Sequence, residues 1–180
     1  MAQAAIAAED ARFRSHSGYD MEGINAALAE LSSGIERPRG GSTITQQLAK
    51  NLFLSGERTL ARKARELLYA LELERVLGKE RILELYINVV EFGPRQYGVR
   101  TASDVYFLKQ PQGLAPQEAA FLAAILPSPR SWYTRVASGA APPKTTVNRI
   151  LGNMVNTGAL DSATARWAQR EPLVIIPPVD

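Results

Sequence analysis

Apolar residues recur three or four positions apart through most of this chain, and this helical period limits its fold more than any other feature. After Asp20, which can cap a helix, the apolar stripe of Met21, Ile24, Leu28 and Leu31 follows that period. Similar stripes continue almost to the end of the chain, separated by glycine, proline and capping residues. The sequence therefore predicts a mainly α fold with only short strands.

Local start and stop signals place the expected helices. Thr43 and Gln46 have capping-box spacing, Gly78 interrupts a long helical stretch, and Pro127 ends a later one. The predicted helices cover residues 20–31, 43–54, 59–77, 79–90, 99–107 and 116–126, with one more around residues 147–154 and a last one capped by Asp161. Residues 93–98 are expected to form a turn and residues 127–143 a loop.

Composition excludes several classes of function. The chain has no cysteine and one histidine, which excludes disulfides, thiolate metal sites and multi-histidine metal centres. A net charge of +3 is a mild basic excess, compatible with an anionic ligand or a membrane surface. The cations gather locally, which argues against nucleic-acid binding. With 180 residues, 46% of them apolar, the chain is long enough for one domain with its own core.

The first chemically distinctive segment is an acid pair near the start of the chain. Glu9 and Asp10 are followed at short range by Phe13 and by the only histidine, His16. A carboxylate held in a cleft can take a proton from a sugar hydroxyl and make its oxygen a competent nucleophile. On spacing alone, the same residues also fit a helix start with solvated acids and a histidine that fills a gap.

A second segment combines two glycines with a helix N-terminus. Gly40 and Gly41 lead into this helix, whose free N–H groups and dipole favour an anion. Thr43, Gln47 and Lys50 share one face of the helix, which suits a phosphate or a sugar. A well-capped helix with an ordinary solvated face has the same pattern.

The third segment is a run of cations ahead of a carboxylate. Arg58, Arg62, Lys63 and Arg65 lie within about two helical turns, and Glu66 follows Arg62 at i+4. Several cations can share the charge of a diphosphate, and guanidinium groups suit phosphate oxygens. The alternative is a solvated basic face with an ion pair worth a few tenths of a kcal/mol.

Together with a fourth segment, these residues resemble a known family. The chain contains EDxxFxxHxGxD from Glu9, GGSTxTQQxxKN from Gly40, RKxxE from Arg62 and KxxILExYxN from Lys79. In this order and at these separations, the motifs resemble the peptidoglycan glycosyltransferase family. The likeness covers residues 5–154 and is greater to the stand-alone, monofunctional form than to the domain of bifunctional penicillin-binding proteins.

The resemblance implies a mainly α, lysozyme-like domain with a large lobe and a small membrane-facing lobe, the latter over residues 21–39. We expect a single glycosyltransferase domain over residues 1–180. The family usually has a membrane-spanning helix ahead of the first motif. The longest apolar run here, residues 119–126, is far shorter than the roughly 20 residues that span a bilayer. We therefore expect the N-terminal membrane anchor to be absent from this chain.

The activity that the resemblance implies is polymerisation of lipid II into peptidoglycan glycan strands. Transfer would proceed with inversion, from an undecaprenyl-diphosphate-linked donor chain to the GlcNAc 4-hydroxyl of lipid II. Glu9 would be the general base, and Glu66 would support the departing diphosphate or the cations around it. The other matching positions would bind substrate, with phosphate at Lys50, Arg58, Arg62 and Lys63 and the remainder of the cleft at Asp10, Phe13, His16, Ser42, Thr43 and Gln47.

The implied partners are lipid II, the lipid-linked glycan chain, the membrane surface and other cell-wall synthesis proteins, with no nucleic acid. The implied location is the bacterial inner membrane, with the catalytic domain on its outer, periplasmic face. No metal site is expected and no cofactor is required, and a divalent cation at the diphosphate is the one candidate.

Two other functions fit part of the pattern. A lysozyme-like lytic enzyme could share the fold and use Glu9 as a general acid to cut glycan, but its substrate has no diphosphate for the cations to bind. A non-catalytic module that binds the cell wall or the membrane surface would not need complete acids at Glu9 and Glu66.

Overall fold

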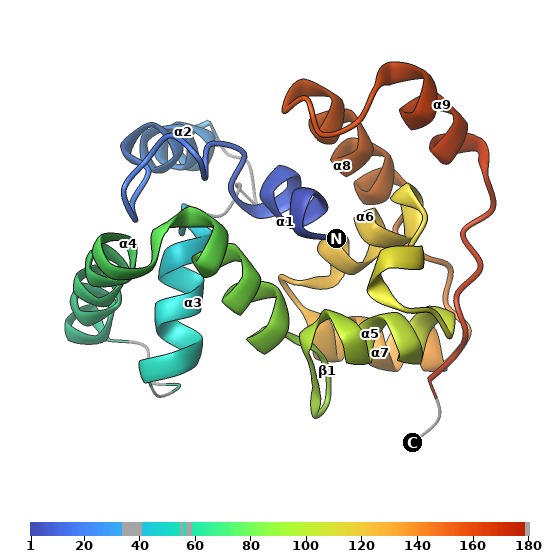
Figure 1. Cartoon of the computed structure of the whole chain (residues 1–180), viewed down its shortest axis with the longest axis horizontal. Helices are drawn as coiled ribbons and strands as arrows, with labels where there is room; N and C mark the ends of the chain where they lie inside the picture. The colour runs from blue at the N-terminus through green and yellow to red at the C-terminus, as the bar shows by residue number, and fades with distance from the viewer. Residues whose placement is uncertain (34–40, 55, 57–58, 179–180) are drawn as a thin grey trace. The chain divides into compact units, whose positions relative to one another are not determined.

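The computed structural model describes residues 1–33, 41–54, 56 and 59–178, and these form two compact units (Figure 1). The first unit comprises residues 1–11 and 87–180, and the second comprises residues 12–86. Helices account for about two thirds of the described residues, and the described sheet has two short strands. The predicted mainly α class is therefore confirmed.

The second unit contains α2 (Met21–Ser32), α3 (Ile44–Phe53) and most of α4 (Leu60–Val89). The capping box predicted for α3 is present, because Gln46 N donates to Thr43 Oγ1 (3.1 Å) and Thr43 N donates to Gln46 Oε1 (3.1 Å). Gly78 has φ 71° and ψ 165°, which breaks α4 into the two helical segments expected on either side of this glycine (Figure 1).

The first unit contains the remaining elements. In chain order these are α1 (Ala2–Glu9), β1 (Glu91–Gly93), β2 (Gln96–Tyr97), α5 (Gly98–Phe107), the 3₁₀ turn η1 (Pro111–Gly113), α6 (Pro116–Ile125), α7 (Pro129–Ala137), α8 (Lys144–Asn156) and α9 (Ser162–Arg170). The predicted cap of the last helix is confirmed, because Asp161 Oδ1 accepts hydrogen bonds from Ala163 N and Thr164 N at 2.9 Å each.

Helix α6 forms the centre of the first unit. Every residue from Ala119 to Ile125 is buried, as expected for a helix that is apolar on all sides. Helices α1, α8 and α9 all pack against α6. Tyr106 of α5 meets the ring of Phe121 edge-on at 5.6 Å between centroids and donates a hydrogen bond to Phe92 O (2.8 Å). This packing holds the short hairpin of β1 and β2 against the helical core.

The structure corrects the sequence prediction in two places. Residues 127–143 were expected to be a loop, but α7 occupies residues 129–137, with Ser128 at the N-cap and Pro129 in the first turn. Proline is compatible with that position because its missing N–H would have no helical partner there. Residues 93–98 were expected to form only a turn, and they also contribute to the antiparallel pairing of β1 with β2.

In the described part of the chain, no helix is both long enough and apolar enough to cross a membrane. Helix α2 lies in the segment predicted to be the small membrane-facing lobe, and residues 34–39 of that segment lie outside the described residues.

Candidate active site

Helix α1 positions the predicted base. Its residues Ala4 to Ala7 are at most 3% exposed, and α1 packs against both α6 and α8. The side-chain amide of Asn153 in α8 donates to Ala7 O (3.0 Å). Glu9 is the last residue of the helix and is half-buried, and the adjacent Asp10 is 7% exposed. Glu9 therefore stands at the end of a helix that is anchored by its core contacts.

The segment after α1 belongs to the second unit and carries Phe13 and His16. Phe13 is fully buried, and its ring meets that of half-buried His16 nearly at right angles, with 6.3 Å between centroids. Asp20 caps α2 by accepting a hydrogen bond from Gly23 N (3.0 Å). The hydrogen bond from Arg12 to Asp20 holds the pKa of that carboxyl below its usual range. These contacts fix the conformation of the loop of residues 10–20, which leads into α2.

The N-terminus of α3 is tied to the same loop. Thr43 is 2% exposed, and its hydroxyl both caps α3 and donates to Gly18 O (2.8 Å). Gln47 accepts a hydrogen bond from the hydroxyl of Tyr86 (3.0 Å). Lys50 is exposed, and its side chain makes no hydrogen bond or ion pair with any residue that the structure describes. Two residues of the polar face predicted for α3, Thr43 and Gln47, therefore form hydrogen bonds with other residues of this chain.

Thr43→Ala should lower the free energy of unfolding by about 2 kcal/mol, because it removes the cap of α3 and leaves the carbonyl of buried Gly18 without its donor. Denaturant unfolding measures this loss. Thr43→Ser is the matched control, because it keeps the hydroxyl and should retain most of the stability. Equal losses in the two variants would show that the methyl group, rather than the hydroxyl, is responsible.

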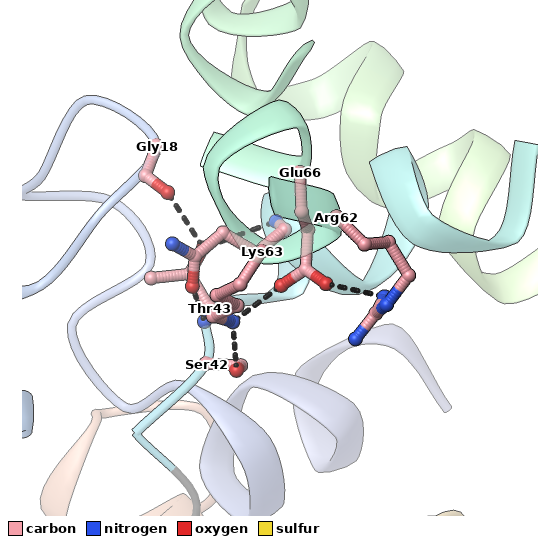
Figure 2. Close-up of polar contacts among 7 residues, drawn as sticks. Gly18, Ser42, Thr43, Arg62, Lys63 and Glu66 are labelled. Carbon is pink, nitrogen blue, oxygen red and sulfur yellow. Dashed lines mark hydrogen bonds and ion pairs between the residues drawn. The ribbon is translucent and has the colours of Figure 1, made fainter. Parts of the chain in front are cut away.

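Ser42, Arg62, Lys63 and Glu66 form a polar group that we name the Glu66 cluster (Figure 2). Arg62 donates to Glu66 Oε2 (3.1 Å), and the ammonium group of Lys63 contacts Glu66 Oε1. Lys63 also donates to Ser42 Oγ (2.8 Å), which connects α4 to the residue before the cap of α3. Figure 2 shows the Glu66 carboxylate between the side chains of Lys63 and Arg62.

The side chains of the Glu66 cluster differ in solvent exposure, and the buried and exposed members have different roles. Glu66 is only 3% exposed, and both of its oxygens contact a cation. Burial of a carboxylate is costly unless cations and hydrogen bonds compensate it, so Glu66 holds Arg62 and Lys63 in place. The Lys63 side chain is 45% exposed, so its ammonium group remains accessible to an anion. The Nε atom of Arg62 is buried and has no hydrogen-bond partner among the described residues.

The structure brings together four of the residues predicted from sequence, Ser42, Arg62, Lys63 and Glu66. Arg58, predicted to bind phosphate with them, lies outside the described residues. In the described ranges no three histidine, aspartate or glutamate side chains gather as metal ligands, and a divalent cation at the diphosphate remains a prediction.

The sequence interpretation did not assign two residues that form hydrogen bonds with side chains of α3. Tyr86 is fully buried and holds Gln47, and Glu74 accepts a hydrogen bond from Thr45. A signal for Glu74 was present, because it follows Glu66 by eight residues, which places both on one face of a helix.

Comparison with known proteins identifies the family. Residues 1–155 match the transglycosylase family model. A biosynthetic peptidoglycan transglycosylase of Acinetobacter baylyi is 50% identical over 128 residues, which cover 71% of this chain and 57% of the relative. The protein of that name from Shewanella amazonensis is 50% identical over 149 residues, covering 83% of this chain and 58% of the relative.

A third biosynthetic peptidoglycan transglycosylase, from Bordetella pertussis, is 42% identical over 179 residues, covering 97% of this chain and 66% of the relative. The chain thus spans between about half and two thirds of the length of the curated relatives it matches. The family match includes Glu9 and all members of the Glu66 cluster. The chain therefore belongs to the transglycosylase family.

Proposed function

We propose that this chain polymerises lipid II into peptidoglycan glycan strands by inverting glycosyl transfer. The observation that carries this proposal is the buried Glu66 carboxylate, which holds Arg62 and Lys63 as a fixed pair of cations. A departing diphosphate is already a good anion, so preorganised cations stabilise it better than a proton donor does. The names of the curated relatives support the same substrate class.

On the leaving side, Arg62 and Lys63 would bind the diphosphate of the donor chain. Each makes an ion pair with Glu66 and has further N–H donors available for phosphate oxygens. Ser42 lies within hydrogen-bond distance of Lys63 and would fix its ammonium group. Glu66 would act by orienting these cations as negative charge develops on the leaving oxygen.

On the acceptor side, Glu9 would take the proton of the GlcNAc 4-hydroxyl of lipid II. The hydroxyl oxygen then forms a bond to the anomeric carbon of the donor, and the bond from that carbon to the undecaprenyl diphosphate breaks. One displacement inverts the configuration, so an α-linked diphosphate gives a β-linked glycan. The core packing of α1 supports this role by holding the Glu9 backbone in place.

We also propose that the chain acts at the periplasmic face of the bacterial inner membrane, where the lipid-linked substrates would be. Large apolar side chains are exposed on the second unit, including Met21 (55%), Phe53 (53%) and Leu60 (91%). Exposed apolar side chains combined with nearby cations favour contact with a lipid surface. Other cell-wall synthesis proteins remain proposed partners.

Incubation of the protein with lipid II in detergent tests this function. We expect glycan polymer to form while undecaprenyl diphosphate is released, and lipid-free glycan to stay uncut. Cleavage of lipid-free glycan without polymer formation would identify a lytic enzyme instead. Tight binding of lipid II without turnover would identify a binding module.

A further inference from the structure

Another carboxylate of α4, that of half-buried Glu74, lies outside the Glu66 cluster. Its side chain is 9% exposed and accepts hydrogen bonds from the hydroxyl of Thr45 (2.6 Å) and from the ammonium group of Lys79 (2.6 Å). The proposed reaction assigns no task to any of these three residues. Removing an ion pair from water carries a desolvation cost. Stability alone therefore does not explain the pair of Glu74 and Lys79.

The pair forms only because α4 is broken at Gly78. Residues five positions apart point to different sides of a continuous α-helix, so Glu74 and Lys79 would not meet in one. Gly78 has a positive φ of 71°, and the chain changes direction there before Lys79 begins the second segment. The ion pair therefore links the two segments of α4 across the break at Gly78.

The same pair also supports the loop that carries predicted site residues. The Lys79 ammonium group lies over the ring of Phe13, 4.5 Å from its centroid, and the Phe13 ring contacts that of His16. Gly18 lies directly on α4, where an added Cβ would be 3.2 Å from the Ala70 carbonyl and 3.3 Å from Glu74 Cγ. The loop, the start of α3 and both segments of α4 thus converge on Glu74 and Lys79.

We propose that Glu74 and Lys79 are positioning residues. They hold Phe13 and His16 in a fixed position relative to the Glu66 cluster. Glu66, Ala70 and Glu74 follow one another at intervals of four, and the first two are buried at 3% and 0% exposure. The same face of α4 therefore carries Glu66 with its cations and, two turns further along the helix, Glu74, which supports the loop. This inference rests on the proposed function, because the loop residues matter only if substrate binds there.

The double variant Glu74→Gln with Lys79→Met tests the proposal. Glutamine keeps an acceptor for Thr45, and methionine keeps most of the lysine volume, so no uncompensated charge is buried. Replacement of a buried ion pair by neutral residues is often close to neutral for stability, and we expect a melting temperature within about 3 °C of the wild type. The loop loses its cation over Phe13, and we expect kcat with lipid II to fall about tenfold or more, with KM changed less than threefold.

His16 gives a readout that does not depend on activity. It is the only histidine in the chain, so its imidazole C–H resonances can be assigned in an NMR spectrum without ambiguity. We expect these resonances to shift in the double variant. The single variant Lys79→Arg, which keeps a cation for Glu74 and Phe13, should retain the wild-type resonance positions and kcat.

The exposed pair of Glu72 and Arg75 on the same helix provides a matched control, with Arg75 Nε 2.9 Å from Glu72 Oε2. Glu72→Gln with Arg75→Met should leave kcat and the His16 resonances unchanged. A double variant at Glu74 and Lys79 with wild-type kcat and unshifted resonances would overturn the proposal. If the wild type makes no polymer, the proposed function fails, and the His16 resonances alone still decide whether the pair positions the loop.

Discussion

Glu9→Gln should give a folded protein that makes almost no glycan polymer. Glutamine preserves the size of the side chain and cannot accept the proton of the acceptor hydroxyl. Loss of a general base typically lowers the rate by 10²–10⁴-fold. The measurement is the initial rate of polymer formation from lipid II, together with binding of lipid II to the variant, which we expect to persist.

The position of Glu9 makes this variant a clean test. The residue is half-buried at the end of α1, whose stability comes from the buried residues Ala4 to Ala7 and from the hydrogen bond of Asn153 to Ala7 O. Substitution at Glu9 leaves those contacts intact, so the melting temperature should change little. Glu72→Gln is the control, because Glu72 is an exposed glutamate paired with Arg75 and should polymerise normally.

Near-wild-type polymerisation by Glu9→Gln would reject Glu9 as the base. The search would then move to Asp10, which follows Glu9 in the chain and is buried, and to Glu66. Asp10→Asn and Glu66→Gln would identify which carboxylate the reaction needs.

The parts of the fold that could be predicted from sequence depend on local interactions. The capping box of Thr43 and Gln46 joins residues three apart, and the break at Gly78 follows from the conformational freedom of one glycine. Helix α7 was missed because prolines at positions 127, 129, 142 and 143 indicated a loop. Its stability comes instead from tertiary packing, since Tyr133 and Val136 are buried and α7 lies against β1.

In the candidate site, too, the local contacts could be predicted from sequence and the distant ones could not. The spacing of Arg62 and Glu66 predicted an ion pair between successive helical turns, and that contact is present. The hydrogen bond from Lys63 to Ser42 joins residues 21 positions apart, and the one from Thr43 to Gly18 joins residues 25 apart. Periodicity carries no information about such distant contacts, because they depend on how α3, α4 and the loop pack together.

The second large effect is expected from Arg62→Ala, which should lower kcat/KM for lipid II by about 10²-fold, the usual cost of removing one preorganised donor at a developing charge. Arg62 donates to Glu66 at 3.1 Å, and its side chain is 16% exposed. Alanine removes this donor and leaves Lys63 as the only described cation paired with Glu66. The measurement is polymerisation kinetics over a range of lipid II concentrations, beside thermal unfolding.

The division of the Arg62→Ala effect between kcat and KM identifies what the guanidinium group does. A lower kcat with little change in KM means that Arg62 stabilises the diphosphate mainly as it departs, whereas a higher KM alone means that it binds donor and transition state equally. We expect the first result, because Glu66 fixes the guanidinium group before substrate arrives. Arg75→Ala is the matched control, since Arg75 pairs with a glutamate on the same helix but is 71% exposed. If Arg62→Ala polymerises as fast as Arg75→Ala, the Glu66 cluster contributes to the fold and not to the reaction.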